Sequence, residues 1–210
     1  REDALKHIYH YEYSGVPCTL DSVAGALGLN RNRAASLLEE LNGRRLISYS
    51  GAEVTLTDAG RGYALSVVRV HRLWERYLSD ETTVQELRWH EEAEKQEHRI
   101  SDEEALQLAK RLGNPLFDPD GDPIPSPGGI VPEQKGKLLQ AFAEGDAVRI
   151  LHVEDEPAAV YAQLVDAGLF PGTTVKVLTS TPEKIVIEKG GKAVDLTMSL
   201  AANITAQRVP

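Results

Sequence analysis

Apolar residues near the start of the chain recur three or four positions apart, which is the spacing of amphipathic helices. The pattern predicts helices over residues 3–13 and 20–27 and a third helix after Asn30. Thr19 stands where an N-cap belongs, and Gly28 begins a tight turn before the third helix. Two short helices joined by a glycine turn, the second opening with polar and basic residues, are typical of a helix-turn-helix.

Two short β-rich runs, residues 46–49 and 54–57, follow the third helix and flank a turn that contains Gly51. A helix-turn-helix followed by a hairpin is the winged-helix arrangement, whose second helix enters the major groove of DNA. The side chains placed to touch bases or phosphates are Arg31, Asn32, Arg33 and Ser36, with Arg44 and Arg45 toward the DNA backbone. Each arginine is equally well explained as a solvated surface charge.

Three further helices are predicted over residues 59–79, 83–99 and 102–112, the last opened by a Ser101/Glu104 capping box. Their leucines, valines and tryptophans form more apolar surface than three helices can bury among themselves. We therefore expect a dimer interface in this region, and a homodimer as the working form.

The last third of the chain changes character. Residues 115–132 are rich in proline and glycine and predict an extended segment without helix or strand. Asp118, Asp120 and Asp122 alternate there as in a calcium loop, but the glycine and glutamate positions of such a loop do not match. Beyond residue 138, short β-branched runs predict a small, strongly bent β-barrel, with strands over 147–153, 174–180, 184–188 and 192–196 and one helix over 158–168.

These elements predict an α+β multidomain protein with four parts. They are a winged helix-turn-helix DNA-binding domain (1–62), a helical metal-binding and dimerisation domain (63–126), a linker (127–137) and an SH3-like β-barrel (138–210). The net charge of −9 lies outside the N-terminal third, since residues 1–80 hold ten Lys/Arg and ten Asp/Glu. A DNA contact would thus be local rather than a broad basic field.

Compartment follows from cysteine usage and hydropathy. The chain has one cysteine and so no internal disulfide, and no apolar run approaches the ~18 residues that span a bilayer. We expect a cytoplasmic protein without membrane contact. Because the sequence begins with Arg1 rather than Met, we also expect residues upstream of it.

The stretch from His90 to His98 contains the candidate chemistry. As an α-helix it places His90, Glu94, Glu97 and His98 within an arc of roughly 100°. His71 and Glu75, four residues apart, form a second such pair on the preceding helix. Imidazoles and carboxylates at helical spacing predict a divalent metal site, although a solvated acidic helix is the plainer explanation of a glutamate-rich stretch.

The order of these motifs resembles a known family. A winged helix-turn-helix is followed by His71-Arg-Leu-Trp-Glu75, by His90-x-x-x-Glu94-x-x-Glu97-His98 and by Asn114-Pro-x-x-x-Pro-x-Gly-x-Pro-Ile-Pro125. This order resembles the diphtheria toxin repressor family of metal-dependent transcriptional repressors. The segment Asp166-Ala-Gly-Leu-Phe-Pro-Gly172 resembles the SH3-like domain of its longer members, shared with ferrous-iron transport accessory proteins.

The resemblance implies two metal sites, and so about two ions per subunit. The primary site matches Asp3, Glu94, Glu97 and His98, and the ancillary site matches His71, Glu75 and His90. A ligand from the barrel is expected to be Asp155, with Glu154 as the next choice. Lys6 stands where manganese-type members have a second acidic ligand, which argues against a paired-metal primary site. The recognition helix start, Asn30 to Ser36, departs from the family pattern, so the operator sequence cannot be inferred.

Ligand type favours manganese first and iron second, because Asp3 and Glu94 make the primary site rich in oxygen and free of sulfur. The leading hypothesis is a non-enzymatic repressor that binds operator DNA as a homodimer with Mn(II) or Fe(II) as corepressor. A metallohydrolase would need a His-Glu-x-x-His type of motif, which the sequence lacks. A regulatory domain of a metal transporter is the remaining alternative, suggested by the accessory-like barrel and the absent initiator Met.

Overall fold

A computed structural model describes residues 1–209, which fold into two compact units that are not contiguous in sequence. The first unit comprises Arg1–Trp74, Ala93–Arg111 and Pro125–Val131. The second unit begins with Glu75–Glu92 and Leu112–Ile124 and takes the rest of the chain from Pro132. None of the described helices combines the length and apolar character needed to cross a membrane.

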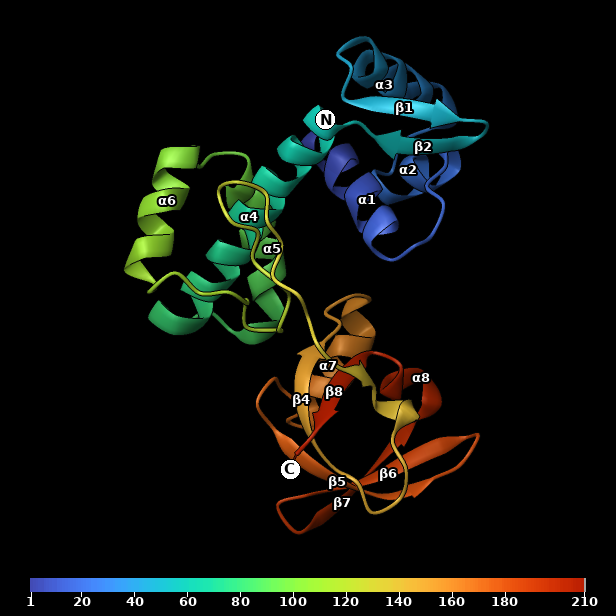
Figure 1. Ribbon diagram of the computed structural model, residues 1–210, viewed down its shortest axis with the longest axis vertical. Helices are drawn as coiled ribbons and strands as arrows, with labels where there is room; N and C mark the ends of the chain where they lie inside the picture. The colour runs from blue at the N-terminus through green and yellow to red at the C-terminus, as the bar shows by residue number, and fades with distance from the viewer. Residues whose placement is uncertain (210) are drawn as a thin grey trace. The chain divides into compact units, whose positions relative to one another are not determined.

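The N-terminal part of the first unit is three helices and a hairpin (Figure 1): α1 (Glu2–Tyr13), α2 (Leu20–Ala26), α3 (Arg31–Gly43), β1 (Ile47–Ser50) and β2 (Glu53–Leu56). The predicted helices and strands are confirmed to within a few residues. Thr19 and Ser22 form a capping box at the start of α2, and the Asn30 side chain caps α3. The apolar stripes meet in one core that includes Ile8, Val23, Leu38 and Val54.

The long helix α4 (Asp58–Glu81) starts against this core. Gly60 makes that contact possible, because a Cβ at this position would lie 1.8 Å from the carbonyl oxygen of Leu46. Within the first unit, the Glu12 side chain joins α1 to the same region, since it accepts from the backbone N–H of Leu56 at 2.7 Å and from Arg61 at 2.6 Å. Any other residue at position 60 would push α4 away from the hairpin.

The predicted helix over residues 83–99 is shorter in the structure. It consists of a 3-10 turn, η1 (Glu86–Arg88), followed by α5 (Trp89–Glu97). The Thr82 hydroxyl donates to the carbonyl of Leu78 at 2.6 Å and accepts from the N–H of Val84 at 3.2 Å, which ends α4 and turns the chain. The β-branched run Thr82–Val84 then lies outside any helix or strand. The last predicted helix is α6 (Asp102–Arg111), opened by the predicted Ser101/Glu104 capping box.

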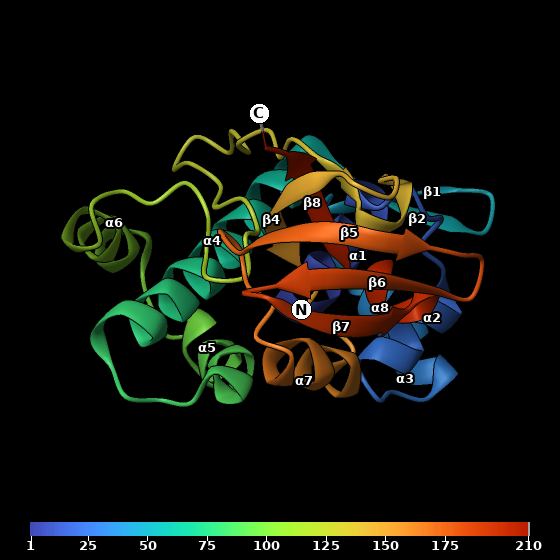
Figure 2. The same cartoon turned by 90° about the horizontal axis from the view of Figure 1, so that it is seen from below.

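The second unit is built on a six-stranded antiparallel sheet in the order β3-β8-β4-β5-β6-β7. Figure 2 shows β5, β6 and β7 side by side. The strands are β3 (Lys137–Leu138), β4 (Ala147–Val153), β5 (Thr174–Ser180), β6 (Lys184–Lys189), β7 (Lys192–Thr197) and β8 (Ile204–Arg208). The helices are α7 (Ala158–Asp166), α8 (Met198–Ala201) and the 3-10 turn η2 (Leu139–Ala141). The four predicted strands and the predicted helix are present, whereas β3, β8 and α8 had no sequence signal strong enough to predict them.

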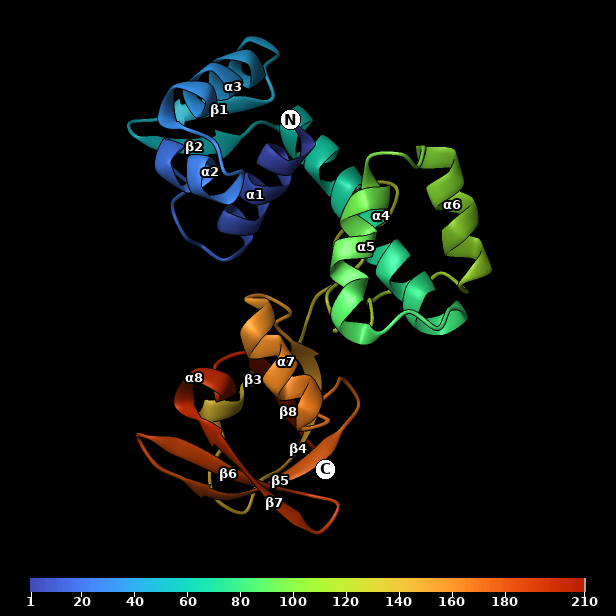
Figure 3. The ribbon, with the colours of Figure 1, turned by 180° about the vertical axis from the view of Figure 1, so that it is seen from behind.

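The small, strongly bent β-barrel that the sequence predicts is confirmed in part: the strands form one bent sheet, but the sheet does not close, since β3 and β7 are not paired in the described chain. Bulges near Leu151 in β4 and Leu178 in β5 bend the sheet strongly. At one edge β3 is only two residues long, and α8 packs against β6, β7 and η2; Figure 3 shows α8 and the strands from behind. The core inside the bend includes Ile150, Leu164 and Ile187, all 0% exposed.

Candidate metal centres

A first cluster of ligand atoms forms in the first unit, where the start of α1 meets the end of α5. Nε2 of His98 lies 2.8 Å from Oδ1 of Asp3 and 3.5 Å from Oε1 of Glu97. One ligand atom from each of these three residues lies within 4.8 Å of the others, a spacing that a single divalent ion can bridge. Asp3 is thus brought to the helix that the sequence analysis singled out.

Glu97 is the buried member of this cluster, with 1% of its side chain exposed. Its Oε2 accepts from Nδ1 of His71 at 2.5 Å, and Nζ of Lys6 lies 3.1 and 3.0 Å from its two oxygens. Burial alone would raise the pKa of Glu97, but the hydrogen bond from His71 and the charge of Lys6 outweigh it and hold the pKa below its usual range. Glu97 therefore stays ionised in the interior.

The remaining primary-site residues surround this pair. The Nδ1 atom of His98 contacts Glu2, a residue that the sequence analysis did not select. A carboxylate on the second ring nitrogen fixes the imidazole's orientation and aims Nε2 at Asp3. Glu94 lies 3.9 Å from Nζ of Lys6 and has a half-exposed side chain. It stands at the edge of the cluster, outside the three-residue group.

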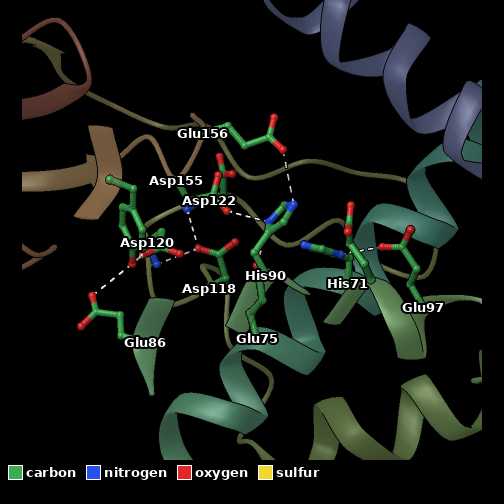
Figure 4. Close-up of polar contacts among 12 residues, drawn as sticks. His71, Glu75, Glu86, His90, Glu97, Asp118, Asp120, Asp122, Asp155 and Glu156 are labelled. Carbon is green, nitrogen blue, oxygen red and sulfur yellow. Dashed lines mark hydrogen bonds and ion pairs between the residues drawn. The ribbon is translucent and has the colours of Figure 1, made fainter. Parts of the chain in front are cut away.

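A second cluster forms in the second unit (Figure 4). Nδ1 of His90 lies 2.7 Å from Oδ2 of Asp155 and 3.3 Å from Oε1 of Glu75, and Nε2 lies 3.5 Å from Glu156. Burial acts to lower the pKa of His90, but the hydrogen bonds and negative charges of Asp155 and Glu75 raise it to about 11. The imidazole carries a proton where these carboxylates converge, and a metal ion would have to displace that proton.

Asp120 also belongs to this cluster, although its place in a poor match to a calcium loop does not predict a ligand there. Its carboxylate offers a ligand atom within 4.8 Å of those of Glu75 and Asp155. The hydroxyl of Tyr161 donates to Asp120 and lies 3.0 Å from Glu86. Burial, together with the charge of Glu75, raises the pKa of Asp120 to about 8. Burial and the charge of Asp120 also raise the pKa of Tyr161 above its ordinary value.

Backbone contacts fix Asp120 in this position. Its carbonyl accepts from the N–H of Val153 at 2.9 Å, and its N–H donates to the Asp118 side chain at 3.0 Å. Gly121 has φ of +93°, and a Cβ there would lie 2.0 Å from the carbonyl oxygen of Leu151. Only glycine allows the loop to lie this close to β4. Residues 115–132 contain no helix or strand, as predicted, but they are not simply extended, because the chain forms an ordered turn around Gly121.

The other predicted site residues are placed as follows. His71 lies one helical turn before Glu75 on α4, is buried and is bonded to Glu97. The backbone N–H of Glu154 donates to Asn203 at 2.9 Å, whereas the neighbouring carboxylate of Asp155 reaches His90. Of the two barrel candidates, the structure thus brings Asp155 into the cluster.

The predicted DNA contacts lie together on α3 and just after it. All six are exposed, four of them in the first two turns of α3 and two directly after its end: Arg31, Asn32, Arg33, Ser36, Arg44 and Arg45. Two of the arginines form ion pairs within the first unit, Arg31 with Asp21 at 2.5 Å and Arg44 with Glu40 at 2.9 Å. The exposed basic surface is local, as the charge distribution predicts.

Both clusters offer carboxylate oxygens and imidazole nitrogens, and neither includes the sulfur of Cys18, which lies against Ser22. Such donor sets suit Mn(II) and Fe(II), which prefer oxygen with some imidazole nitrogen. Buried carboxylates in both clusters also need positive charge close by. The residues therefore fit divalent ions of this kind.

Comparisons with known proteins agree with this arrangement. Residues 57–126 match the family model described as "Iron dependent repressor, metal binding and dimerisation domain", and residues 137–208 match the FeoA domain. The iron-dependent repressor IdeR of Mycobacterium leprae (strain TN) is 29% identical over 220 residues, covering 98% of this chain and 95% of the relative.

The solved structure titled "Manganese-dependent transcriptional repressor complex with manganese" is 30% identical, with a TM-score of 0.91 and 99% of each chain covered. A probable metal transport system membrane protein of Chlamydia trachomatis (serovar D, strain ATCC VR-885 / DSM 19411 / UW-3/Cx) is 39% identical over 80 residues, 38% of this chain but 18% of that protein.

The fold and the paired His/carboxylate clusters define the class of metal-responsive regulators with a helical metal-binding and dimerisation domain. Within that class, the chain belongs to the diphtheria toxin repressor family of metal-dependent transcriptional repressors, as its resemblance implied.

Proposed function

We propose that this chain represses transcription as a homodimer that binds double-stranded operator DNA, with Mn(II) or Fe(II) as corepressor. One observation carries the proposal: Asp3 at the start of α1 meets Glu97 and His98 at the end of α5. Because α1 packs against α2 and β2, an ion held there would tie the DNA-binding helices to the dimerisation helix.

The primary site would take Asp3, Glu94, Glu97 and His98, and the second would take His71, Glu75, His90 and Asp155. Asp155 is preferred to Glu154 because its carboxylate contacts His90. Asp120 is an additional ligand candidate at the second site. With both sites filled, each subunit would hold two ions. A bound ion would supply positive charge to carboxylates that otherwise repel one another, and would lower the entropy lost on DNA binding.

Within this proposal the N-terminal elements act as a winged helix-turn-helix. α3 would lie in the major groove, with Arg31, Asn32, Arg33 and Ser36 toward the DNA. The β1–β2 hairpin would form the wing. Arg44 and Arg45 would contact the sugar-phosphate backbone of the DNA. Residues 1–62 would be the DNA-binding domain, 63–126 the dimerisation domain and 138–210 the SH3-like domain. Metal and operator binding would strengthen each other by the same factor.

The transporter alternative is not supported. The repressor relative matches along almost the whole of both chains, whereas the transport protein matches over less than a fifth of its length. We place the protein in the cytoplasm, acting on DNA rather than as an enzyme. Of the two metals, we propose manganese first and iron second, on the oxygen-rich donor set.

A DNA-binding titration tests the proposal. Duplexes selected from a random pool in the presence of MnCl₂ are labelled, and binding is followed by fluorescence anisotropy with Mn(II), with Fe(II) under anaerobic conditions, and with chelator. We expect binding with either metal and its loss with chelator or with Glu97→Gln. Equally tight binding by Glu97→Gln with and without metal would refute the proposed switch.

A further inference from the structure

Lys6 reaches into the primary cluster through Glu97. It stands one turn after Asp3 on α1, and 23% of its side chain is exposed. Its ammonium contacts both carboxylate oxygens of Glu97, at 3.1 and 3.0 Å, and lies 3.9 Å from Glu94. A cation of the chain itself thus lies among the carboxylates that would bind a metal.

Glu97 needs such a cation in the metal-free protein. A carboxylate with 1% of its side chain exposed loses nearly all its hydration, and an uncompensated buried charge is strongly unfavourable. The hydrogen bond from His71 satisfies part of one oxygen. Lys6 provides the full positive charge, and it also joins α1 to α5 when no ion does so.

The same contact opposes metal binding. Both oxygens of Glu97 accept from Lys6, so an ion that coordinates Glu97 must compete with that ammonium. Ammonium and metal ion also repel, because both are positive and would lie within a few ångströms of the same oxygens. The flexible four-carbon stem of lysine allows its head to swing away toward solvent when an ion arrives.

We propose that Lys6 is a tethered counter-ion of the primary site, exchanged for the metal ion on activation, and that it sets the metal concentration at which the repressor responds. This inference rests on the proposed function, because it assigns a role to Lys6 at the same site. Metal binding is then an ion exchange in which a divalent charge at Glu97 replaces a single one. The position of Lys6, rather than the metal ligands alone, determines the affinity.

Lys6→Met tests this by removing the charge while keeping a long side chain, and Lys6→Arg is the control that keeps the charge. Both are made in the full chain carrying Glu75→Gln and Asp155→Asn, which disable the second site. Mn(II) binding is measured by calorimetry and by the electron paramagnetic resonance signal of free Mn(II). The melting temperature is measured without metal.

We expect Lys6→Met to bind Mn(II) about tenfold more tightly or better, since a repelling charge has gone. Its metal-free melting temperature should fall, because Glu97 has lost its counter-ion. The Mn(II) affinity of Lys6→Arg should stay within about threefold of that of the chain with Lys6, because arginine retains the charge. Lys6→Gln repeats the test should Lys6→Met fail to fold.

A merely structural lysine would give weaker metal binding and a lower melting temperature together. Unchanged or weaker Mn(II) binding in both neutral variants overturns the exchange while leaving the metal site itself standing. If no Mn(II) binds even with Lys6 present, the primary metal site and the proposed function are both refuted, together with the exchange role of Lys6.

Discussion

Nε2 of His98 lies 2.8 Å from Oδ1 of Asp3, so the end of the dimerisation helix α5 meets the first turn of α1. This contact joins residues that are distant in sequence, at the point where a metal ion could control the DNA-binding helices. The neighbouring Glu2 contacts the other nitrogen of the same imidazole. We therefore propose separate roles for the two acidic residues, with Asp3 as a metal ligand and Glu2 as the group that orients the ring.

Asp3→Asn should weaken Mn(II) binding more than Glu2→Gln does. Glu2→Gln removes the carboxylate that orients His98 and that also accepts from the Tyr63 hydroxyl, so we expect a loss of about 10–100-fold in Mn(II) affinity. Asp3→Asn removes a ligand and should lose more, with metal-dependent DNA binding abolished. Calorimetry gives the affinity and anisotropy gives the DNA binding. A larger loss in Glu2→Gln than in Asp3→Asn would reverse the two assignments.

Asp155→Asn and Glu154→Gln test the second site with two adjacent carboxylates. The Asp155 carboxylate contacts His90 at 2.7 Å. We expect Asp155→Asn to reduce bound Mn(II) from two ions per subunit to one, because the site loses an anionic ligand, and Glu154→Gln to leave two. Elemental analysis of the protein after dialysis against MnCl₂ measures the number. Loss of the ion in Glu154→Gln alone would assign the ligand to Glu154.

Local patterns could be read from the sequence, whereas contacts between distant segments could not. Burial of one helical face dictates the spacing of Ala4, Leu5 and Ile8, so α1 is predictable from that spacing alone. The non-helical run after Thr82 was missed because a side-chain hydrogen bond overrides a helical composition. The open sheet was missed because no pattern indicates that β3 has only two residues.

The same limit applies to the clusters. His71 and Glu75 lie on one helix, so their spacing places them without knowledge of the fold. Asp120 and Tyr161 come from a loop and from α7, and their contact depends on how the second unit packs. The alternation of Asp118, Asp120 and Asp122 is apparent in the sequence, but the calcium-loop pattern does not indicate that Asp120 lies beside Glu75 and Asp155.

The stability of the metal-free protein should fall as pH rises. The folded pKa of Asp120 is about 8 against 3.8 for the free side chain, and that of His90 is about 11 against 6.5. At these two residues together the folded state holds more protons than the unfolded state from about pH 4 to pH 11, so their deprotonation favours unfolding over that range. Bound metal should reverse the trend, because it binds the deprotonated groups.

Asp120→Asn isolates the carboxyl's part of this dependence, since it keeps the shape of the side chain and removes the titration. We expect its metal-free melting temperature at pH 8 to exceed that of the unsubstituted chain by about 2–4 °C or more, the shift that 1 kcal/mol gives in a protein of this size. At pH 5 the difference should shrink, because Asp120 is then mostly protonated. Calorimetric scans in chelator measure both. If Asp120→Asn raised the melting temperature less at pH 8 than at pH 5, the raised pKa of Asp120 would be contradicted.

Arg33→Ala should weaken DNA binding at every sequence rather than at one base pair, if Arg33 contacts phosphate. Arg33 is exposed on α3 and its backbone N–H is held by the Asn30 cap, so the substitution leaves the helix start intact. The slope of log affinity against log salt concentration should become shallower by about one unit.

Arg149→Ala removes the same charge from the surface of β4 and should leave the slope unchanged. If Arg33→Ala instead relaxes the preference at a single position of the selected duplex, Arg33 reads a base edge. An unchanged affinity and slope would show that α3 does not bind DNA through this residue.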